Sequence, residues 1–384
     1  MVFMIYLDNP ATTKRKPLSV VTSLTKNTLL NSVNAGRGGH KYSIKGAKIV
    51  TDTADKLAKL FKISAPERIA FTQNATLALN MAINGILSQG GHAIVTSMEH
   101  NSVLRPVNKL GNYTVVYADN EGYVNPEDIK AAIKDDTKLI VCTHASNVSG
   151  SIQPIAEIGK IARANGLIFL VDAAQSAGTV DIDVDAMCID LLAFSGHKSL
   201  LGPLGTGGLY VGERARLEPY ITGGTGSLSK SLTQPLTLPD MLHSGTLNTP
   251  AIAALGRAVD FILKKGSSKI LAHERLLAEN LINRLDSIDG VSVLGGRDMN
   301  KRNGTVAFTV DGMPSEEVSR ILAVQYDIAT RGGWHCAYLA HKTLGTARHG
   351  AVRAGFSYYN SMYDVRALSY AISDIVKNLR AVHF

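Results

Sequence analysis

Short apolar runs alternate with helical patterns from residue 68 to residue 212, and this alternation constrains the fold more than any other feature. In one unit, Ile155, Ile158 and Ala162 mark one face of a helix that Asn165-Gly166 ends, between two apolar runs. Such alternation is typical of a mostly parallel sheet with helices on both faces, so we predict an α/β fold. The seven expected strands are residues 68–71, 93–96, 114–117, 138–141, 167–171, 191–194 and 208–211.

The pattern changes after Pro250, which predicts a second and smaller domain. A long helical stretch is followed by strand-like runs at 291–294 and 305–308 and by a helix from about residue 364 to residue 379. A chain of 384 residues is long enough for two domains. We expect a large domain of residues 14–250 and a small α+β domain of residues 1–13 and 251–384, with a first strand in residues 1–7.

Composition and charge narrow the class of protein further. Apolar residues make up 45% of the chain and charged residues 19%, a balance that excludes a disordered chain. The formal net charge is +8, but Lys and Arg are scattered, so nucleic acid is not an expected partner. No apolar run approaches the ~20 residues of a membrane span. Three cysteines without paired spacing are typical of a reducing compartment, so we expect a cytoplasmic protein.

Polar residues gather where the predicted strands end. Five such clusters are residues 72–76, 99–100, 146–147, 172–175 and 195–198. Ligands of open α/β sheets bind beyond the carboxyl ends of the strands. We therefore expect one binding site to which all five clusters contribute.

Lys198 and Asp172 indicate what that site can hold. Lys198 follows an apolar run and precedes the glycine-rich segment 201–208, and a lysine there can form a Schiff base, although a surface loop lysine is the alternative. Asp172 ends another apolar run and can pair with a protonated pyridine nitrogen. Asp at such a turn also serves as a helix N-cap, and the two interpretations do not exclude each other.

A turn and a histidine supply further groups. The backbone N–H groups of Ala75 and Thr76, with the Thr76 hydroxyl, can hold a phosphate at a helix N-terminus, or the turn can be a plain helix cap. His100 is suited to stacking on a ring and to moving protons near neutral pH, or it can be a structural histidine.

In this order along one chain, these segments resemble the class V aminotransferase group of fold-type I enzymes, which carry pyridoxal 5'-phosphate (PLP), and within it the cysteine desulfurases. The resemblance spans almost the whole chain. It runs from Tyr6-Leu-Asp-Asn-Pro-Ala-Thr-Thr13, through the clusters above, to Val352-Arg-Ala-Gly-Phe-Ser357 and Tyr358-Tyr-Asn360.

The resemblance implies a role for each matching position. Lys198 would hold the cofactor, His100 would stack on its pyridine ring, and Asp172 would pair with the ring nitrogen. Arg353 would bind the substrate carboxylate as a bidentate fork, unless it is an exposed strand arginine. The remaining implied contacts are Gln175 at the ring hydroxyl, Asn147 beside cofactor and substrate, Thr76, Ser195 and His197 around the phosphate, and Gly245-Thr246 reaching the phosphate from the other subunit of a homodimer.

The segment Arg331-Gly-Gly-Trp-His-Cys336-Ala337 is similar to the Arg-x-Gly-x-His-Cys-Ala signature of group II desulfurases, which include SUF-type enzymes and selenocysteine-lyase-like proteins. A thiol must be ionised to attack sulfur, and we expect the basic neighbours Arg331 and His335 to favour the Cys336 thiolate. The resemblance also places Arg331 beside the substrate. An inert packed cysteine is disfavoured, because the flanking residues form no apolar period.

The predicted reaction is the desulfuration of L-cysteine, in which Lys198, His100 and Cys336 act, L-alanine leaves and Cys336 becomes a persulfide that serves a sulfur-acceptor protein or small thiol. A selenocysteine lyase or a cystine-type C–S lyase would use the same site without a persulfide. An aminotransferase or epimerase would not need Cys336, and a non-catalytic PLP-fold binding protein is a further alternative. No metal site is expected.

Three departures from the family pattern leave the sulfur acceptor unassigned. Asn74-Ala75 replaces a more usual Gly-Thr pair, Leu77 replaces an acid, and Trp334 stands where SUF-type enzymes often have histidine. Phosphate binding would then depend on backbone donors.

Overall fold

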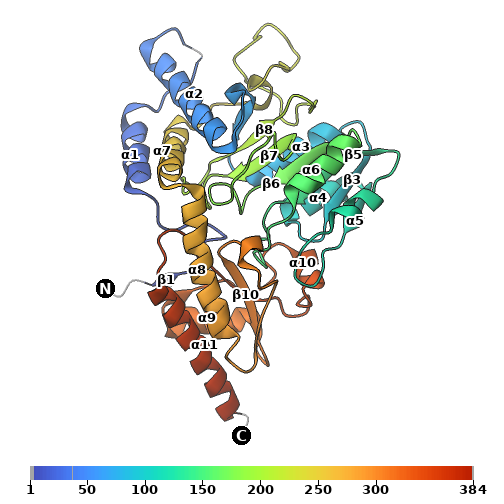
Figure 1. Ribbon diagram of the computed structural model, residues 1–384. Coiled ribbons are helices and arrows are strands. Elements are labelled where there is room, and N and C mark those ends of the chain that lie inside the picture. The colour runs from blue at the N-terminus through green and yellow to red at the C-terminus, as the bar shows by residue number, and fades with distance from the viewer. Residues whose placement is uncertain (1–3, 37, 383–384) are drawn as a thin grey trace.

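The computed structural model describes residues 4–36 and 38–382, and its main element is a sheet with strand order β2-β8-β7-β6-β5-β3-β4 (Figure 1). Strand β8 is antiparallel to both of its neighbours, and all other pairs are parallel. The predicted fold class is confirmed, and each expected strand overlaps an observed one. The strands are β2 (Ile69–Thr72), β3 (His92–Thr96), β4 (Tyr113–Val116), β5 (Thr137–Thr143), β6 (Ile168–Asp172), β7 (Leu191–Ser195) and β8 (Gly207–Val211).

Helices cover both faces of this sheet. Successive strand residues point to opposite faces, so Ile140 and Phe169 join one buried cluster while Leu139 and Leu170 join another. Because both faces are buried, the strands are apolar along their length. The first face is covered by α2 (Lys41–Phe61), α5 (Pro126–Ala131), α6 (Ile155–Ala164) and α7 (Thr249–Lys265), and the second by α3 (Ala75–Leu87) and α4 (Asn101–Leu110).

A separate core lies in the C-terminal part of the chain. Here a sheet of order β12-β10-β9 packs against α8, α9 and α11. Strand β1 (Ile5–Tyr6) pairs in parallel with β11 (Ile328–Ala329), so the described start of the chain joins this part. Residues 1–3 of the expected first strand lie outside the described residues. The elements are β9 (Val291–Val293), β10 (Thr305–Val310), β12 (Val352–Gly355), α8 (Ser267–Leu285), α9 (Ser315–Gln325), α10 (Tyr338–Thr343) and α11 (Met362–Val382).

Helix α7 lies between the two parts along the chain and packs on α1 (Leu18–Leu30) and α2, as Figure 1 shows. Its residues Leu255 and Val259 belong to the core of the large sheet. The division into domains stays a prediction; along the chain, Gly266 separates α7 from α8. Within the described residues, no helix is long and apolar enough to cross a membrane.

Candidate active site

The carboxyl ends of β3, β5, β6 and β7 share one edge of the large sheet, and most of the predicted site residues lie there. Asp172 ends β6, and Lys198 follows β7 by three residues. Asp172, Arg353 and Cys336 all act electrostatically on Lys198, so strand β12 and the loop before α10 come close to the sheet edge at this point. The structure therefore brings the predicted lysine, aspartate, arginine and cysteine together.

The amino group of Lys198 is free for covalent chemistry. No side chain among the described residues forms a hydrogen bond or ion pair with its Nζ, whereas its carbonyl oxygen accepts from Thr13 Oγ1 at 2.9 Å. Desolvation, partly offset by the charge of Asp172, lowers the pKa of Lys198 to about 8. Near physiological pH, a lysine with such a pKa is neutral more often than an ordinary lysine is. An amine must be neutral to act as a nucleophile.

Asp172 offers one free carboxylate oxygen. Its Oδ1 accepts a hydrogen bond from the backbone N of Ala174 at 2.9 Å, and no donor among the described residues reaches the other oxygen. The residue is buried, and desolvation raises its pKa. A cationic N–H group, such as a protonated pyridine, would satisfy this oxygen and restore the charged form.

The turn before α3 packs closely against strand β8. Asn74 caps the helix, its Oδ1 accepting from the N of Leu77 at 3.0 Å, and the N of Ala75 donates to Ser195 Oγ at 3.0 Å. A Cβ on Gly207 would lie 2.8 Å from the Asn74 backbone, so only glycine allows this approach. The first-turn N–H groups of a helix and a nearby hydroxyl form an anion site. His197 adds a buried Nδ1 that has no partner among the described residues.

His100 caps α4, and Ser102 connects it to Thr76 in the first turn of α3. The Nδ1 of His100 accepts from the N of Ser102 at 3.1 Å and lies 2.9 Å from Ser102 Oγ, which is itself 2.8 Å from Thr76 Oγ1. Burial, followed by the charge of Lys198, lowers the pKa of His100 to about 4. The ring is therefore neutral, and Nδ1 as acceptor leaves the proton on Nε2. Sequence reasoning missed Ser102, although its place two residues after His100 at a helix start was a usable signal.

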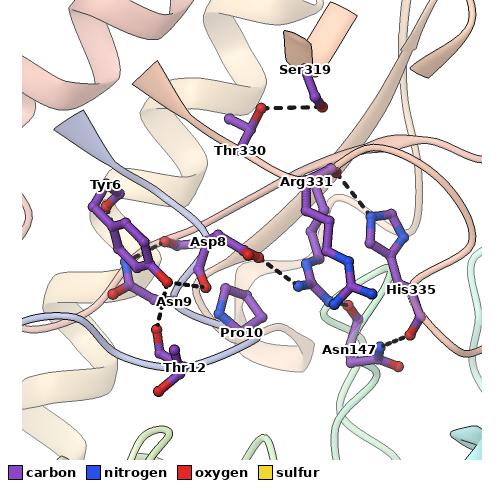
Figure 2. A network of polar contacts seen from close by, with 12 residues as sticks. Tyr6, Asp8, Asn9, Pro10, Thr12, Asn147, Ser319, Thr330, Arg331 and His335 are labelled. Atoms are coloured by element: carbon purple, nitrogen blue, oxygen red, sulfur yellow. Dashed lines mark hydrogen bonds and ion pairs between the residues drawn. The ribbon is translucent and has the colours of Figure 1, made fainter. Parts of the chain in front are cut away.

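Arg353 is held by two partners and keeps one nitrogen unengaged. Nη2 of Arg353 pairs with Asp8 Oδ1 at 2.8 Å, and Nη1 donates to the Asn147 carbonyl oxygen at 3.0 Å. Figure 2 shows Asp8 and Asn147 in the surrounding network. The Nε atom is buried and unpartnered within the described residues. Desolvation lowers the pKa of Arg353, but an arginine stays charged. Asp8 was not singled out from the sequence.

Gln175 and Thr246 have different surroundings. Gln175 is buried, and its Nε2 donates to the Pro10 carbonyl oxygen at 2.9 Å. Thr246 is exposed and lines a cavity of about 550 Å³ together with Asn74 and His197 of the same chain. Its contact with a cofactor bound to a second subunit stays a prediction.

Cys336 lies exposed on the loop between β11 and α10. The N of Asn101 donates to the Cys336 carbonyl oxygen at 2.7 Å, and Asn147 Nδ2 donates to the His335 carbonyl oxygen at 2.8 Å. Arg331 is exposed, and its backbone pairs with that of Arg353. Cys336 interacts electrostatically with Arg353. Cys142, in contrast, is buried in β5, and desolvation raises its pKa.

The expectation that His335 favours the thiolate through its charge is wrong. Its Nε2 faces the Arg331 carbonyl oxygen at 3.0 Å, and its Nδ1 faces His341 Nε2 at 3.1 Å (the first contact is drawn in Figure 2). Burial and the charge of Arg353 lower the pKa of His335 to about 2. The ring is therefore neutral, and neither nitrogen is available to the Cys336 thiol.

The fold and this site define the class of the protein: the chain belongs to the aminotransferase class-V family, whose profile matches residues 5–368. Proteins of this family use PLP. The free amine of Lys198, the free oxygen of Asp172 and the anion site at the start of α3 fit that cofactor.

Individual relatives cover nearly all of the chain. A protein of Methanothermobacter thermautotrophicus named "Probable cysteine desulfurase" is 34% identical over 97% of this chain and 94% of its own length. The cysteine desulfurase of Haloferax volcanii is 33% identical over 96% of this chain and 88% of its own. The apo structure of cysteine desulfurase from Thermococcus onnurineus NA1 superposes with a TM-score of 0.91 at 33% identity, covering 98% of this chain and 95% of that one.

Proposed function

We propose that this chain is a PLP-dependent cysteine desulfurase that converts L-cysteine to L-alanine and takes the sulfur on Cys336. The observation that carries the proposal is an exposed thiol, Cys336, that lies within electrostatic range of both Lys198 and Arg353. One site thus combines a free amine, a carboxylate-binding guanidinium and a nucleophile. The near full-length similarity to proteins named cysteine desulfurase supports this activity.

The cofactor contacts follow from the free groups of the site. Lys198 would hold PLP covalently, Asp172 would pair with its ring nitrogen, and Ser195 with the first turn of α3 would hold its phosphate. His100 would face the ring. When bound, PLP supplies an electron sink that acidifies the α-proton of the substrate.

The protein's own residues would then bind and move groups on L-cysteine. Arg353 fixes the carboxylate, and the amine of Lys198, once the substrate amine has displaced it, takes the α-proton. The Cys336 thiolate attacks the substrate Sγ, so that an S–S bond forms and the Cβ–Sγ bond breaks. The electron pair of the broken bond stays on Cβ, which takes up the proton that the substrate thiol gave up, while the neutral His100 faces the cofactor with its proton on Nε2. Lys198 returns the proton to Cα, L-alanine leaves, and Cys336 carries the sulfur as a persulfide for an acceptor.

We also propose a homodimer in the cytoplasm. Leu228, Leu232 and Leu236 are strongly exposed in the segment before η2 (Asp240–Leu242), and Thr246 is exposed nearby. Exposed apolar residues gathered in one segment often mark a contact surface between proteins. Sedimentation of the PLP-bound protein tests this assembly.

Steady-state turnover separates desulfuration from the lyase alternatives. The wild-type protein and Cys188→Ala should form L-alanine from L-cysteine in the presence of a thiol reductant, and Cys336→Ala should lose this activity. Cys188 is the matched control because it is the other cysteine with some exposure. If Cys336→Ala kept its turnover with L-cysteine, selenocysteine or cystine, the protein would be a lyase.

A further inference from the structure

Two histidines and a threonine form a chain of hydrogen bonds behind the Cys336 loop. Thr346 Oγ1 lies 2.8 Å from His341 Nδ1, and His341 Nε2 lies 3.1 Å from His335 Nδ1. His335 Nε2 then lies 3.0 Å from the Arg331 carbonyl oxygen. His341 is fully buried and His335 nearly so. The chain therefore links the segment after α10 to the residue next to Cys336.

The carbonyl group at one end sets the direction of every bond. A carbonyl oxygen only accepts, so His335 Nε2 carries a proton and, in a neutral ring, Nδ1 accepts from His341 Nε2–H. His341 Nδ1 must in turn accept from the Thr346 hydroxyl. Burial, with the charge of Arg353 acting in the same direction, lowers the pKa of His335 to about 2 and that of His341 to about 4. Both rings are therefore neutral in solution near pH 7.

The loop that these residues support has an unusual backbone. His335 and Cys336 are consecutive non-glycine residues in the left-handed region, with φ of 50° and 57°. Such conformations persist only where the surroundings enforce them, and they gather at functional sites. Asn147 and Asn101 bind the two carbonyl oxygens of this pair. The hydrogen bonds of the His335 ring are a third constraint on this loop, and the hydrogen-bond chain fixes the position of that ring.

We infer that His341 and Thr346 are positioning residues, which hold the His335 ring and thereby fix the Cys336 thiol where it can take sulfur from the substrate. The inference rests on the proposed function, because it concerns the transfer of sulfur to Cys336. The guanidinium of Arg353, the proposed carboxylate site, has two partners that are not members of this hydrogen-bond chain, Asp8 Oδ1 and the Asn147 carbonyl oxygen. Loss of this chain of hydrogen bonds should therefore slow sulfur transfer and leave substrate binding intact.

Thr346→Val in the PLP-bound enzyme tests this separation, because it removes the hydroxyl at nearly constant size. A displacement of about 1 Å in a reacting group can cost roughly 100-fold in rate, so we expect kcat for L-alanine formation to fall about tenfold or more, with KM within about twofold. Thr346→Ser, which keeps the hydroxyl, should restore kcat to within about threefold of wild type.

Thr343→Val is the matched control. Thr343 is the last residue of α10. Its Oγ1 also forms a hydrogen bond of 2.8 Å, to Ser97 Oγ, but it is not a member of the hydrogen-bond chain of His335, His341 and Thr346. We expect its kcat to stay within about twofold of wild type. A Thr346→Val enzyme as fast as wild type, or a Thr343→Val enzyme as slow as Thr346→Val, would overturn the inference.

Hydrogen exchange supplies a readout that needs no turnover. In the PLP-bound protein without substrate, peptides covering residues 331–337 should exchange faster in Thr346→Val than in wild type or Thr343→Val. Equal exchange in all three proteins would show that the hydrogen-bond chain does not hold the loop of residues 331–337. The two failures are distinct: wild-type protein that forms no L-alanine contradicts the proposed function, whereas active wild type with an unaffected Thr346→Val contradicts only this inference.

Discussion

Asp8 pairs with Arg353 at 2.8 Å, so the N-terminal segment and strand β12 meet where the substrate carboxylate is proposed to bind. The pair joins residues that are 345 positions apart in the chain. Asp8 neutralises a buried guanidinium and occupies one of its nitrogens, while Nε is buried without a partner among the described residues. A substrate carboxylate would therefore meet an arginine that is already oriented.

Asp8→Asn should lower the free energy of unfolding by about 2 kcal/mol, because it leaves Arg353 charged and buried beside a neutral amide. Breaking a fully buried pair costs about 3–5 kcal/mol, and the Asp8 side chain is 22% exposed, which reduces the loss. L-Alanine should stabilise this variant more than wild type, because its carboxylate supplies the missing anion. Denaturant titration with and without L-alanine measures both effects.

Asp286→Asn is the matched control for this prediction. Asp286 pairs with Arg297 at 2.9 Å on the surface, where an ion pair contributes about 0–1 kcal/mol. Equal losses in the two variants, or no added effect of L-alanine on Asp8→Asn, would show that Arg353 does not depend on Asp8.

Ser102→Ala should weaken PLP binding about five- to tenfold, because the hydroxyl connects His100 to Thr76 and a hydrogen bond contributes about 1 kcal/mol. Equilibrium titration of the apoprotein with PLP measures the dissociation constant. Ser88→Ala, at the other end of α3, is the control and should bind PLP like wild type. Unchanged affinity in Ser102→Ala would separate Ser102 from the cofactor site.

Covalent attachment of PLP to the apoprotein should speed up as the pH rises toward 8 and level off above about pH 9. Only the neutral amine reacts with an aldehyde, and burial lowers the pKa of Lys198 from 10.5 to about 8. The rate at which the cofactor absorbance changes after mixing, measured across this pH range, tests the shift. A rate that continued to rise up to pH 10.5 would indicate an ordinary lysine, and Lys198→Arg should show no attachment at all.

Glu99→Gln should make the stability of the protein less dependent on pH. Desolvation raises the pKa of Glu99 from 4.5 to about 8, and its Oε2 is buried without a partner among the described residues. The folded state thus binds this proton more tightly than the unfolded state. The contribution is complete below about pH 4.5 and is lost as the pH rises through about 8.

Unfolding of wild type and Glu99→Gln at about pH 5, 7 and 8.5 measures this effect. The free energy of unfolding of wild type should fall more steeply with pH than that of Glu99→Gln. The stability of the variant relative to wild type should therefore rise toward about pH 8.5. Glu274 has a similar shift but is common to both proteins, so it does not enter the difference. Parallel curves would show that Glu99 is ionised in the folded protein.

The sequence was sufficient to predict the large sheet, because strands buried on both faces are continuous apolar runs. It placed the strand ends less well: β6 ends at Asp172 and β7 at Ser195, polar residues that indicate a loop when read alone. Lys198 and Asp172 could be proposed because the edge of a parallel sheet gathers its strand ends. The roles of Asp8 and His341 could not, since they depend on contacts that only folding creates. His335 was misinterpreted because the sequence shows a basic residue but not its burial.

The central claim is that Cys336 takes the sulfur atom of L-cysteine. The most direct test is a single turnover of PLP-bound protein with L-cysteine and no reductant, followed by quantification of L-alanine and intact mass. We predict one L-alanine for each active site and a mass gain of one sulfur atom, both absent in Cys336→Ala. L-Alanine or pyruvate formed without any sulfur retained on the protein would contradict the account.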